Sequence, residues 1–455
     1  MWMLVLASLP FLQDPVESTV FERQAEAWLD RSLTGGDVTG VAVLVSLGDE
    51  NVFEQGLGHL GGEPASVDAA VAAAPLTELL AVMCALDLVE KGLLDLEQPV
   101  GTYLPGLDFD GGTVLVRHLL AQTSGVPAYR GQAPDEDERP RDKTGLAGLH
   151  QRMQHLARYA PLLEALDGSS LEHEPGRCLT YSNSNVLLLG VLVEAISGKE
   201  LAQLTGSTLA PAMELERTAF DGDLRAPREG MVELGPDART LRASFAPLAG
   251  GRLRTSARDL LTLQRGILER RVLGEAATRH MLGEKSLDDG SPVGFGFGIG
   301  ATELEGHAGY HYGGRTGSSW IHVAHYPVFD TTIALVAEGS LERIAPLERQ
   351  LVRLLFDLPG EAGEARELDP VMGGRYVGLY QLGCNRLSFL LDDGALLLDS
   401  ALHGRRGLDY LGGHTFVDPS DRELRIRFEA VDGEPAHSVI IEEAGVHGIA
   451  SRIPD

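Results

Sequence analysis

The chain has 455 residues, of which 44% are hydrophobic and 23% are charged, and its formal net charge is −28 at pH 7. This length allows two or three domains with sizeable cores. From this acidic composition we expect no nucleic-acid partner, because the chain has no excess of basic side chains to neutralise phosphates. We interpret the acidity as a contribution to solubility.

The cysteines and histidines give no sign of a metal or cofactor site. Cys84, Cys178 and Cys384 lie far apart, without the spacing of metal ligands. We therefore predict that they are buried small hydrophobic residues and form no disulfide framework. The fourteen histidines include no His-Glu-x-x-His pattern. The sequence predicts neither a metal nor a cofactor.

The first twelve residues are apolar and read as a possible signal peptide over residues 1–14. Ala7 and Ser8 supply the small residues of a cleavage site, although a basic start is missing. We expect export to the periplasm or the exterior. A mis-set start codon or a buried N-terminal segment is the alternative, with a cytoplasmic protein. No later run approaches about 18 apolar residues, so no transmembrane helix is expected.

The elements from residue 20 to residue 357 indicate an α+β domain. Helical spacing over residues 20–33 precedes a predicted hairpin with its turn at residues 48–51. A helix is predicted from Pro75 to Lys91, ended by Gly92. The following residues, to about Gly250, are mostly helical in pattern.

The remainder of this domain returns to strands. Residues 320–339 read as a strand pair that turns near Pro327. A helix then begins near Pro346 and places leucines on one face, namely Leu347, Leu351, Leu354 and Leu355. Strands at both ends with helices between them predict one antiparallel sheet with a helical insertion, over residues 15–357.

A second domain is predicted after a linker at residues 358–372, which is rich in Gly, Glu and Pro. Residues 373–455 read as a small all-β domain. An Asp393-Gly394 turn separates two apolar runs, and residues 424–429 alternate apolar and charged side chains.

Four stretches in order resemble one enzyme family. They are "VRHLLAQTSGVPAY" (116–129), "EPGRCLTYSNSNVLLLGVLVEAISG" (174–198), "APLAGGRLRTSARDLLTL" (246–263) and "YHYGGRTGSSW" (310–320). Together they resemble the serine β-lactamase and penicillin-binding-protein family, in the branch of class C β-lactamases, D-alanyl-D-alanine carboxypeptidases and related esterases. The resemblance covers residues 20–357 and implies the β-lactamase/transpeptidase-like fold. The segment from Gly373 onward resembles the small β-domain that often follows the catalytic domain in this family.

The resemblance implies a cleft with three facing motifs, two of which are present. Tyr181 and Asn183 match the family's Tyr-x-Asn, which supplies a phenolic base and a substrate-binding amide. His311, Gly313 and Gly314 match its His-x-Gly strand, which lines the opposite wall. These residues also have purely structural interpretations. Tyr181 and Asn183 would form a hydrogen-bonded pair that holds their loop, and His311 would be a strand histidine with its hydrogen bonds made. The two glycines would allow close packing of the strands.

The third motif, Ser-x-x-Lys, is absent. Its positions fall on Pro75 and Glu78, and no serine stands three residues before any lysine of the chain. Proline has no nucleophilic oxygen and no backbone N–H, and in the family the N–H of this residue is one of two oxyanion donors. A carboxylate at position 78 opposes a phenolate at Tyr181, where a lysine would favour it.

Three functions follow as hypotheses. We favour a catalytically inactive homologue of these hydrolases whose cleft binds a peptide or cell-wall-type ligand. The first alternative is an active esterase or amidase in which Tyr181 or His311 activates water. The second alternative is an exported adaptor that acts through its C-terminal β-domain.

Overall fold

The structure is a computed structural model, and its described residues are 14–33, 38–129, 159–220, 253–283, 285–304, 307–339, 347–358, 365–392, 394–400, 404–419, 424–430, 433–443 and 446–454. The signal peptide predicted for residues 1–14 lies outside these residues, apart from Asp14. Within the described ranges no helix has the length and apolar character needed to cross a membrane.

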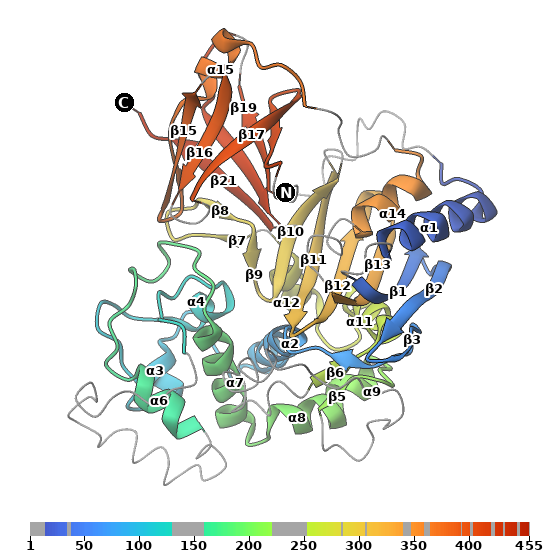
Figure 1. Ribbon diagram of the computed structural model, residues 1–455. Helices are drawn as coiled ribbons and strands as arrows, with labels where there is room; N and C mark the ends of the chain where they lie inside the picture. The colour runs from blue at the N-terminus through green and yellow to red at the C-terminus, as the bar shows by residue number, and fades with distance from the viewer. Residues whose placement is uncertain are drawn as a thin grey trace.

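An eight-stranded antiparallel sheet forms the centre of the larger domain, in the order β3-β2-β1-β13-β12-β11-β10-β9 (Figure 1). The strands are β1 (Val38–Leu47), β2 (Glu50–Leu60), β3 (Glu63–Pro64), β9 (Phe295–Gly296), β10 (Ile299–Leu304), β11 (His307–Thr316), β12 (Ser319–Tyr326) and β13 (Thr331–Gly339). β1 pairs with β13, with Val43 opposite Leu335. The sheet is therefore built from both ends of the domain, which confirms the predicted α+β class.

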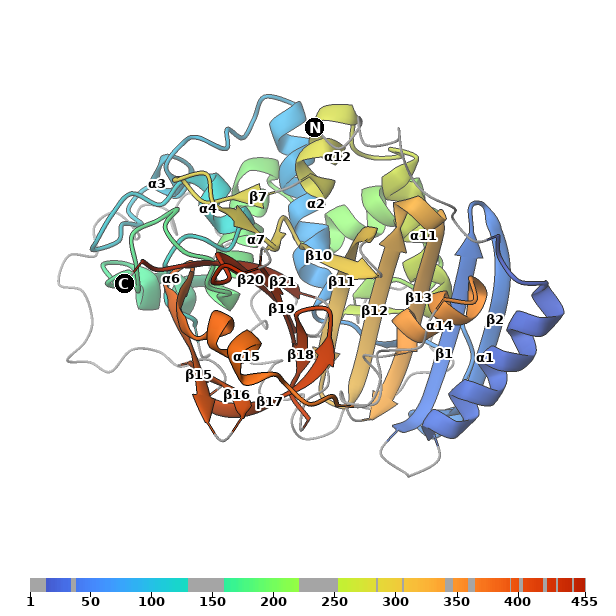
Figure 2. The same cartoon turned by 90° about the horizontal axis from the view of Figure 1, so that it is seen from above.

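The sheet separates two hydrophobic cores. One face packs against α1 (Ser18–Leu33) and α14 (Leu347–Leu355), and the other packs against α2 (Leu76–Glu90) and α11 (Ala257–Leu268) (Figure 2). Along β1, Val43 belongs to the first core, whereas Ala42 and Leu44 belong to the second. This alternation follows from the two-residue period of a strand. The face that each residue of a strand takes decides which core it joins.

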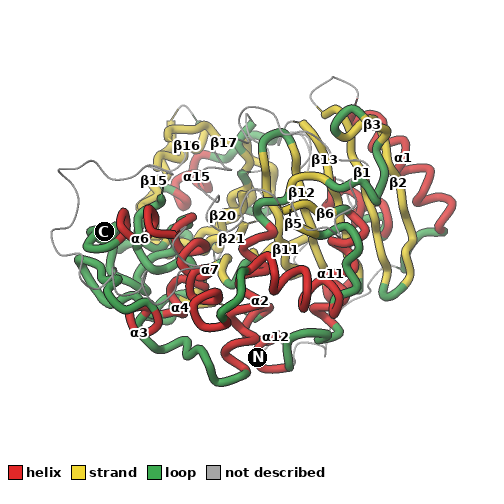
Figure 3. The backbone as a smooth tube through the Cα atoms, turned by 90° about the horizontal axis from the view of Figure 1, so that it is seen from below, coloured by secondary structure: helices red, strands yellow, loops and turns green. Residues whose placement is uncertain are grey.

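Helix α2 runs through the second core and is buried on nearly all sides. It lies beside α7 (Asn183–Ser197), as Figure 3 shows. A helix that is apolar all round is typical of the interior of a large domain. Pro75 precedes its first residue, and Gly92 follows its end with a φ of +69°. The predicted helix is confirmed, and its start lies beside β11.

Smaller elements surround these helices. They are α3 (Val100–Tyr103), α4 (Val116–Leu120), α6 (Ala160–Leu166), α8 (Leu201–Leu204), the π-helix η4 (Thr205–Leu209), α9 (Ala210–Ala212), α12 (Glu275–Leu282) and the 3-10 helix η6 (Pro327–Phe329). Short strands form a three-stranded sheet of β4 (Val71–Ala72), β5 (Ala219–Phe220) and β6 (Leu253–Thr255), and a pair of β7 (Lys285–Ser286) and β8 (Pro292–Val293).

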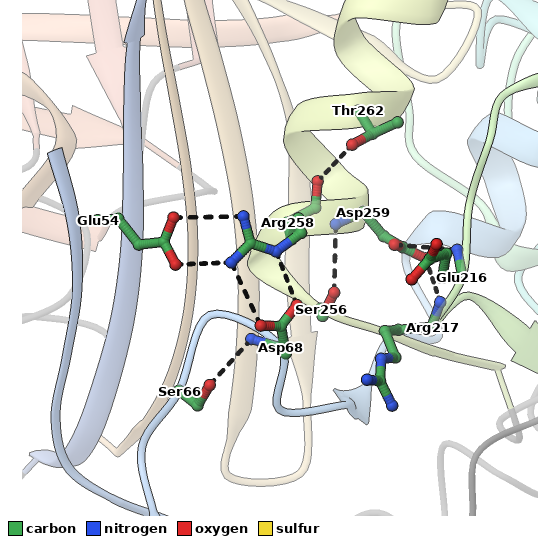
Figure 4. Close-up of polar contacts among 9 residues, drawn as sticks. All are labelled: Glu54, Ser66, Asp68, Glu216, Arg217, Ser256, Arg258, Asp259 and Thr262. Carbon is green, nitrogen blue, oxygen red and sulfur yellow. Dashed lines mark hydrogen bonds and ion pairs between the residues drawn. The ribbon is translucent and has the colours of Figure 1, made fainter. Parts of the chain in front are cut away.

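A polar network at the start of α11 anchors the loop that leads to α2 (Figure 4). Arg258 Nε donates to Asp68 Oδ1 at 2.7 Å, and its Nη2 donates to Glu54 Oε1 on β2 at 2.6 Å. The next residue, Asp259, is buried and accepts from Arg217 N at 2.7 Å. Charge-assisted bonds of this kind are stronger than neutral ones. They fix the strand-to-helix loop relative to β2 and α11.

The C-terminal part is a closed eight-stranded barrel beside β8 and β10 (Figure 1). Its strands are β14 (Gly378–Leu382), β15 (Asn385–Asp392), β16 (Ala395–Ser400), β17 (Gly404–Gly412), β18 (Thr415–Val417), β19 (Arg425–Glu429), β20 (Ser438–Glu443) and β21 (Val446–Arg452). β14 pairs with β21, so the sheet has no open edge. Aromatic rings fill the interior, including Phe389 and Phe428 with centroids 4.8 Å apart.

The barrel is preceded by a helix that the sequence analysis did not predict, α15 (Pro370–Tyr376). This helix crosses the boundary between the predicted linker and the predicted all-β segment. Asp369 caps it by accepting from Val371 N and Met372 N, each at 2.9 Å, and Pro370 occupies its first position. These are ordinary helix-start signals. The domain boundaries themselves remain predictions.

The prediction that the cysteines form no disulfide is wrong for two of them. Cys178 and Cys384 are bonded, with Cα atoms 5.4 Å apart and a sequence separation of 206 residues. The bond joins the loop before Tyr181 to the turn between β14 and β15. Cys84 is a buried free thiol, as expected. The barrel and the larger domain are thus covalently connected close to the candidate site.

We expect one alkylated cysteine when the protein is denatured without reductant, and three after reduction. Mass spectrometry of the alkylated chain gives both counts. The Cys384→Ser variant should lose about 2–4 kcal/mol of unfolding free energy, because the bond closes a long loop. Three alkylated cysteines without reductant would contradict the pairing.

Candidate functional site

The start of α2 meets the glycine-rich end of β11. A Cβ atom built on Gly314 would lie 3.1 Å from Pro75 Cγ, and Gly314 has a φ of +147°. Ala74 N donates to Thr316 Oγ1 at 3.0 Å and holds the strand there. A glycine at this position allows the strand to approach the proline ring. Two motifs far apart in the sequence are therefore brought together.

The side chain of Gln122 is the centre of a buried polar cluster. Its Nε2 donates to Glu78 Oε1 at 3.0 Å. Its Oε1 accepts from Ser182 N at 3.0 Å and from Asn185 Nδ2 at 2.6 Å. Gln122 is 1% exposed and has a φ of +57°, a left-handed conformation that costs free energy in a non-glycine residue. The amide fastens α2 and the start of α7 to the loop after α4.

Ser124 also belongs to this cluster, through a hydrogen bond to Asn185. Its Oγ donates to Asn185 Oδ1 at 2.5 Å and also accepts from Val126 N at 3.0 Å. The first bond orients the amide of Asn185 so that its Nδ2 faces Gln122. Ser124 is completely buried. Its hydroxyl is committed to the fold and is not presented to solvent.

Glu78 is a buried acid at the position expected for the lysine. It is 8% exposed, and burial raises the pKa of its carboxyl to about 7, against the opposing hydrogen bonds from Gln122 and Tyr181. In a desolvated position the neutral form is favoured unless donors compensate. The carboxyl therefore changes its protonation close to neutral pH.

Tyr181 presents its ring to solvent and its hydroxyl to Glu78. The whole side chain is 52% exposed, yet the hydroxyl end is enclosed by protein. Burial of this end, together with the charge of Glu78, raises the pKa of Tyr181 well above its ordinary value. Tyr181 thus stays a phenol that donates to Glu78. Its ring also meets Phe295 edge-on, with centroids 6.2 Å apart.

Asn183 and Gly313 occupy the edges of this site. Asn183 is the first residue of α7 and is half-buried, but the amide bonded to Gln122 belongs to Asn185. A Cβ on Gly313 would lie 2.2 Å from Ile321 O, so this glycine is required by strand packing. The structural interpretation of Gly313 thereby has direct support.

His311 lies on the other face of the sheet. It pairs with Ala324, which belongs to the core beneath α1 and α14, and its ring stacks on His322 with centroids 5.5 Å apart. Cross-strand partners share a face. Tyr312, its neighbour, belongs to the core around α2. The structure therefore brings Pro75, Glu78, Tyr181 and Gly314 together and leaves His311 apart.

Gln122, Ser124 and Asn185 stand within the motif stretches at residues 116–129 and 174–198, but no role was predicted for any of them. A usable signal existed for Asn185, because a polar residue directly before the apolar run "VLLLGVLV" predicts a buried amide that needs partners. For Gln122 the sequence carried no comparable signal. Among the described residues no group of three or more His, Cys, Asp and Glu is placed to hold a metal ion.

Comparisons with known proteins identify the family of this chain. A family model described as Beta-lactamase matches residues 25–354. Penicillin-binding protein 4* of Bacillus subtilis (strain 168) is 25% identical over 401 residues, which cover 80% of this chain and 83% of that protein. Protein flp of Staphylococcus aureus (strain MW2) is 25% identical over 212 residues, 44% of this chain and 38% of that protein. The chain thus matches well under half the length of flp.

The fold is also similar to that of solved structures, among them a structure of SurE. The crystal structure of SurE with D-Leu aligns with a TM-score of 0.58 and 24% sequence identity. The alignment covers 96% of this chain and 100% of that chain. At this identity the likeness concerns the fold alone.

The raised pKa of Glu78 predicts a pH-dependent stability. The folded protein holds this proton up to about pH 7, against an ordinary value of 4.5. The unfolding free energy should therefore fall through this group by about 3 kcal/mol as pH rises from 4.5 to 7. We expect Glu78→Gln to lack this loss. Urea unfolding of both proteins near pH 5 and pH 8 measures it; a pH-independent difference between them would show that Glu78 titrates normally.

Proposed function

The chain belongs to the Beta-lactamase family, and we propose that it binds a ligand in its cleft without forming an acyl-enzyme. The observation that supports this proposal most strongly is that Pro75 stands at the start of α2 and packs against Gly314. Loss of a nucleophile costs about 10⁶ in rate, and loss of one oxyanion donor costs roughly 10²–10³. Proline at position 75 supplies neither a nucleophile nor an oxyanion-binding N–H.

The hydroxyls around Pro75 are poor replacements for the missing serine. Thr77 is fully buried in α2, and Ser124 is buried and bonded to Asn185. Thr316 accepts from Ala74 N and is 1% exposed. A nucleophile needs access to substrate and a base within hydrogen-bond reach. None of these three has both.

The charge at the site favours a ligand with an amino group. Glu78 offers a carboxyl that ionises near neutral pH, and Tyr181 offers an exposed ring beside it. An ammonium gains from an opposite charge and from an aromatic face. We therefore propose a peptide or cell-wall-type ligand with a free amino group. SurE was solved with D-Leu, which carries such a group.

We further propose that the protein is exported. The support is the disulfide between Cys178 and Cys384, because such bonds persist in oxidising compartments and are rare in the cytosol. Export would place the cleft where cell-wall peptides occur.

Calorimetry with two matched ligands tests the binding proposal. D-leucine amide carries an ammonium, whereas N-acetyl-D-leucine amide has the same side chain and no charge. We expect the first to bind at least about tenfold more tightly, a difference of about 1.4 kcal/mol. Glu78→Gln should remove this preference, and Asp87→Asn at the far end of α2 should keep it. Equal affinity of the wild-type protein for both ligands would contradict the proposed role of Glu78.

A second candidate is hydrolysis by activated water, and the pKa of Glu78 near 7 favours it. A carboxylate with such a pKa suits a general base. Tyr181 is disfavoured because its own pKa is raised, and His311 lies on the other face. This candidate requires turnover of a p-nitrophenyl ester that Glu78→Gln abolishes. Equal rates in both proteins, at the level of the uncatalysed reaction, would eliminate it.

A further inference from the structure

A cavity lies outside the Glu78 cluster. It has a volume of about 220 Å³ and is bounded by α4, α12 and β7. Ala121 and Thr123, which flank Gln122 in sequence, form part of its wall, while the Gln122 side chain bonds to Glu78. The cavity is smaller than those that hold drug-sized ligands. It suits a small molecule.

Phe297 contributes an aromatic surface to this cavity in a strained conformation. Its φ is +56°, which is unusual for a bulky side chain. The ring stacks on His280 with centroids 6.4 Å apart and planes 15° apart, and Phe297 N donates to Leu120 O at 2.6 Å. Strained residues that the surrounding structure holds in place concentrate at ligand sites. The strain is an observation independent of the cavity itself.

Lys285 places a positive charge at this aromatic surface. Its Nζ lies 5.1 Å from the centroid of Phe297 and donates to Met281 O at 3.0 Å and to Gly283 O. Within the described ranges no carboxylate forms an ion pair with it. Burial lowers the pKa of Lys285 to about 8. The amine is desolvated, and the partners that the described residues supply to it are backbone carbonyls and an aromatic ring.

The other cations of the cavity are already paired. Arg117 Nη1 lies 2.6 Å from Asp288 Oδ1, and its Nε lies 3.0 Å from Glu97 Oε2. Arg279 is paired with Glu275. Lys285 is therefore the one lysine or arginine of this lining that has no ion pair among the described residues. Because Arg117 already contacts two carboxylates, further negative charge is unfavourable in this partly desolvated site, and a singly charged anion is favoured over a dianion.

We propose that this cavity binds a small organic monocarboxylate. Its carboxylate pairs with Lys285 Nζ, and its hydrocarbon part lies against the rings of Phe297 and His280. This inference concerns a site separate from the cleft and does not rest on the proposed function.

The small number of lysines allows a direct test. The chain has four, namely Lys91, Lys143, Lys199 and Lys285. Reductive ¹³C-methylation of the whole protein keeps their charge and gives each lysine its own NMR signal. Lys285→Arg identifies the signal of Lys285. Titration with sodium benzoate should shift this signal saturably, with a Kd on the order of 1 mM, while the Lys91 and Lys199 signals stay in place.

Three comparisons make the outcome decisive. Inorganic phosphate, titrated in the same way, should bind at least about tenfold more weakly than benzoate. Ligand-observed NMR on unmethylated protein should show benzoate binding that Lys285→Met weakens at least about tenfold and that the matched surface variant Lys199→Met leaves unchanged. The inference is overturned if benzoate leaves the Lys285 signal in place, if all lysine signals move together, or if phosphate binds as tightly as benzoate.

Discussion

The side-chain amide of Gln122 connects the parts of the molecule on which the candidate site depends. An amide can donate from its nitrogen and accept at its oxygen at once. Gln122 uses both, because it donates to Glu78 on α2 and accepts from Ser182 N and Asn185 at the start of α7. A buried donor or acceptor that loses its partner costs about 1–3 kcal/mol. Gln122 has a strained left-handed backbone conformation, and these hydrogen bonds hold it there.

The replacements at positions 75 and 78 fit this cluster and one another. Pro75 suits the first turn of a helix, where no intrahelical N–H bond is lost. Glu78 lies in that first turn, where the helix dipole favours a negative charge. Gln122 and Tyr181 supply the donors that a buried carboxyl needs. The site is therefore a hydrogen-bonded polar cluster that includes a buried carboxyl and has Gln122 at its centre.

Features with a local pattern could be predicted from the sequence. The hairpin of β1 and β2, the apolar helix α2 and the strand pair of β12 and β13 all follow from periodicity and turn residues. The alternation in β19 likewise indicated a half-buried strand of the small all-β domain. Such signals lie within one segment, so no tertiary information is needed to read them.

Features that depend on contacts between distant segments could not be predicted. Cys178 and Cys384 are 206 residues apart, and nothing local distinguishes them from Cys84. The position of His311 depends on strand register, because a shift by one residue would turn its ring to the other face. The partners of Gln122 come from two other segments, so its role appears only when the chain is folded. The motif at Tyr181 was visible, but the buried state of its hydroxyl was not.

The central claim is that this family fold has a cleft that cannot be acylated, because Pro75 and Glu78 stand where the serine and lysine would be. Intact-mass spectrometry after incubation with a penicillin and with a fluorophosphonate probe tests it most directly. The account predicts no adduct on the wild-type protein and an adduct at residue 75 of the Pro75→Ser/Glu78→Lys variant. An adduct on the wild-type protein would contradict the account, and its mapped position would identify the nucleophile.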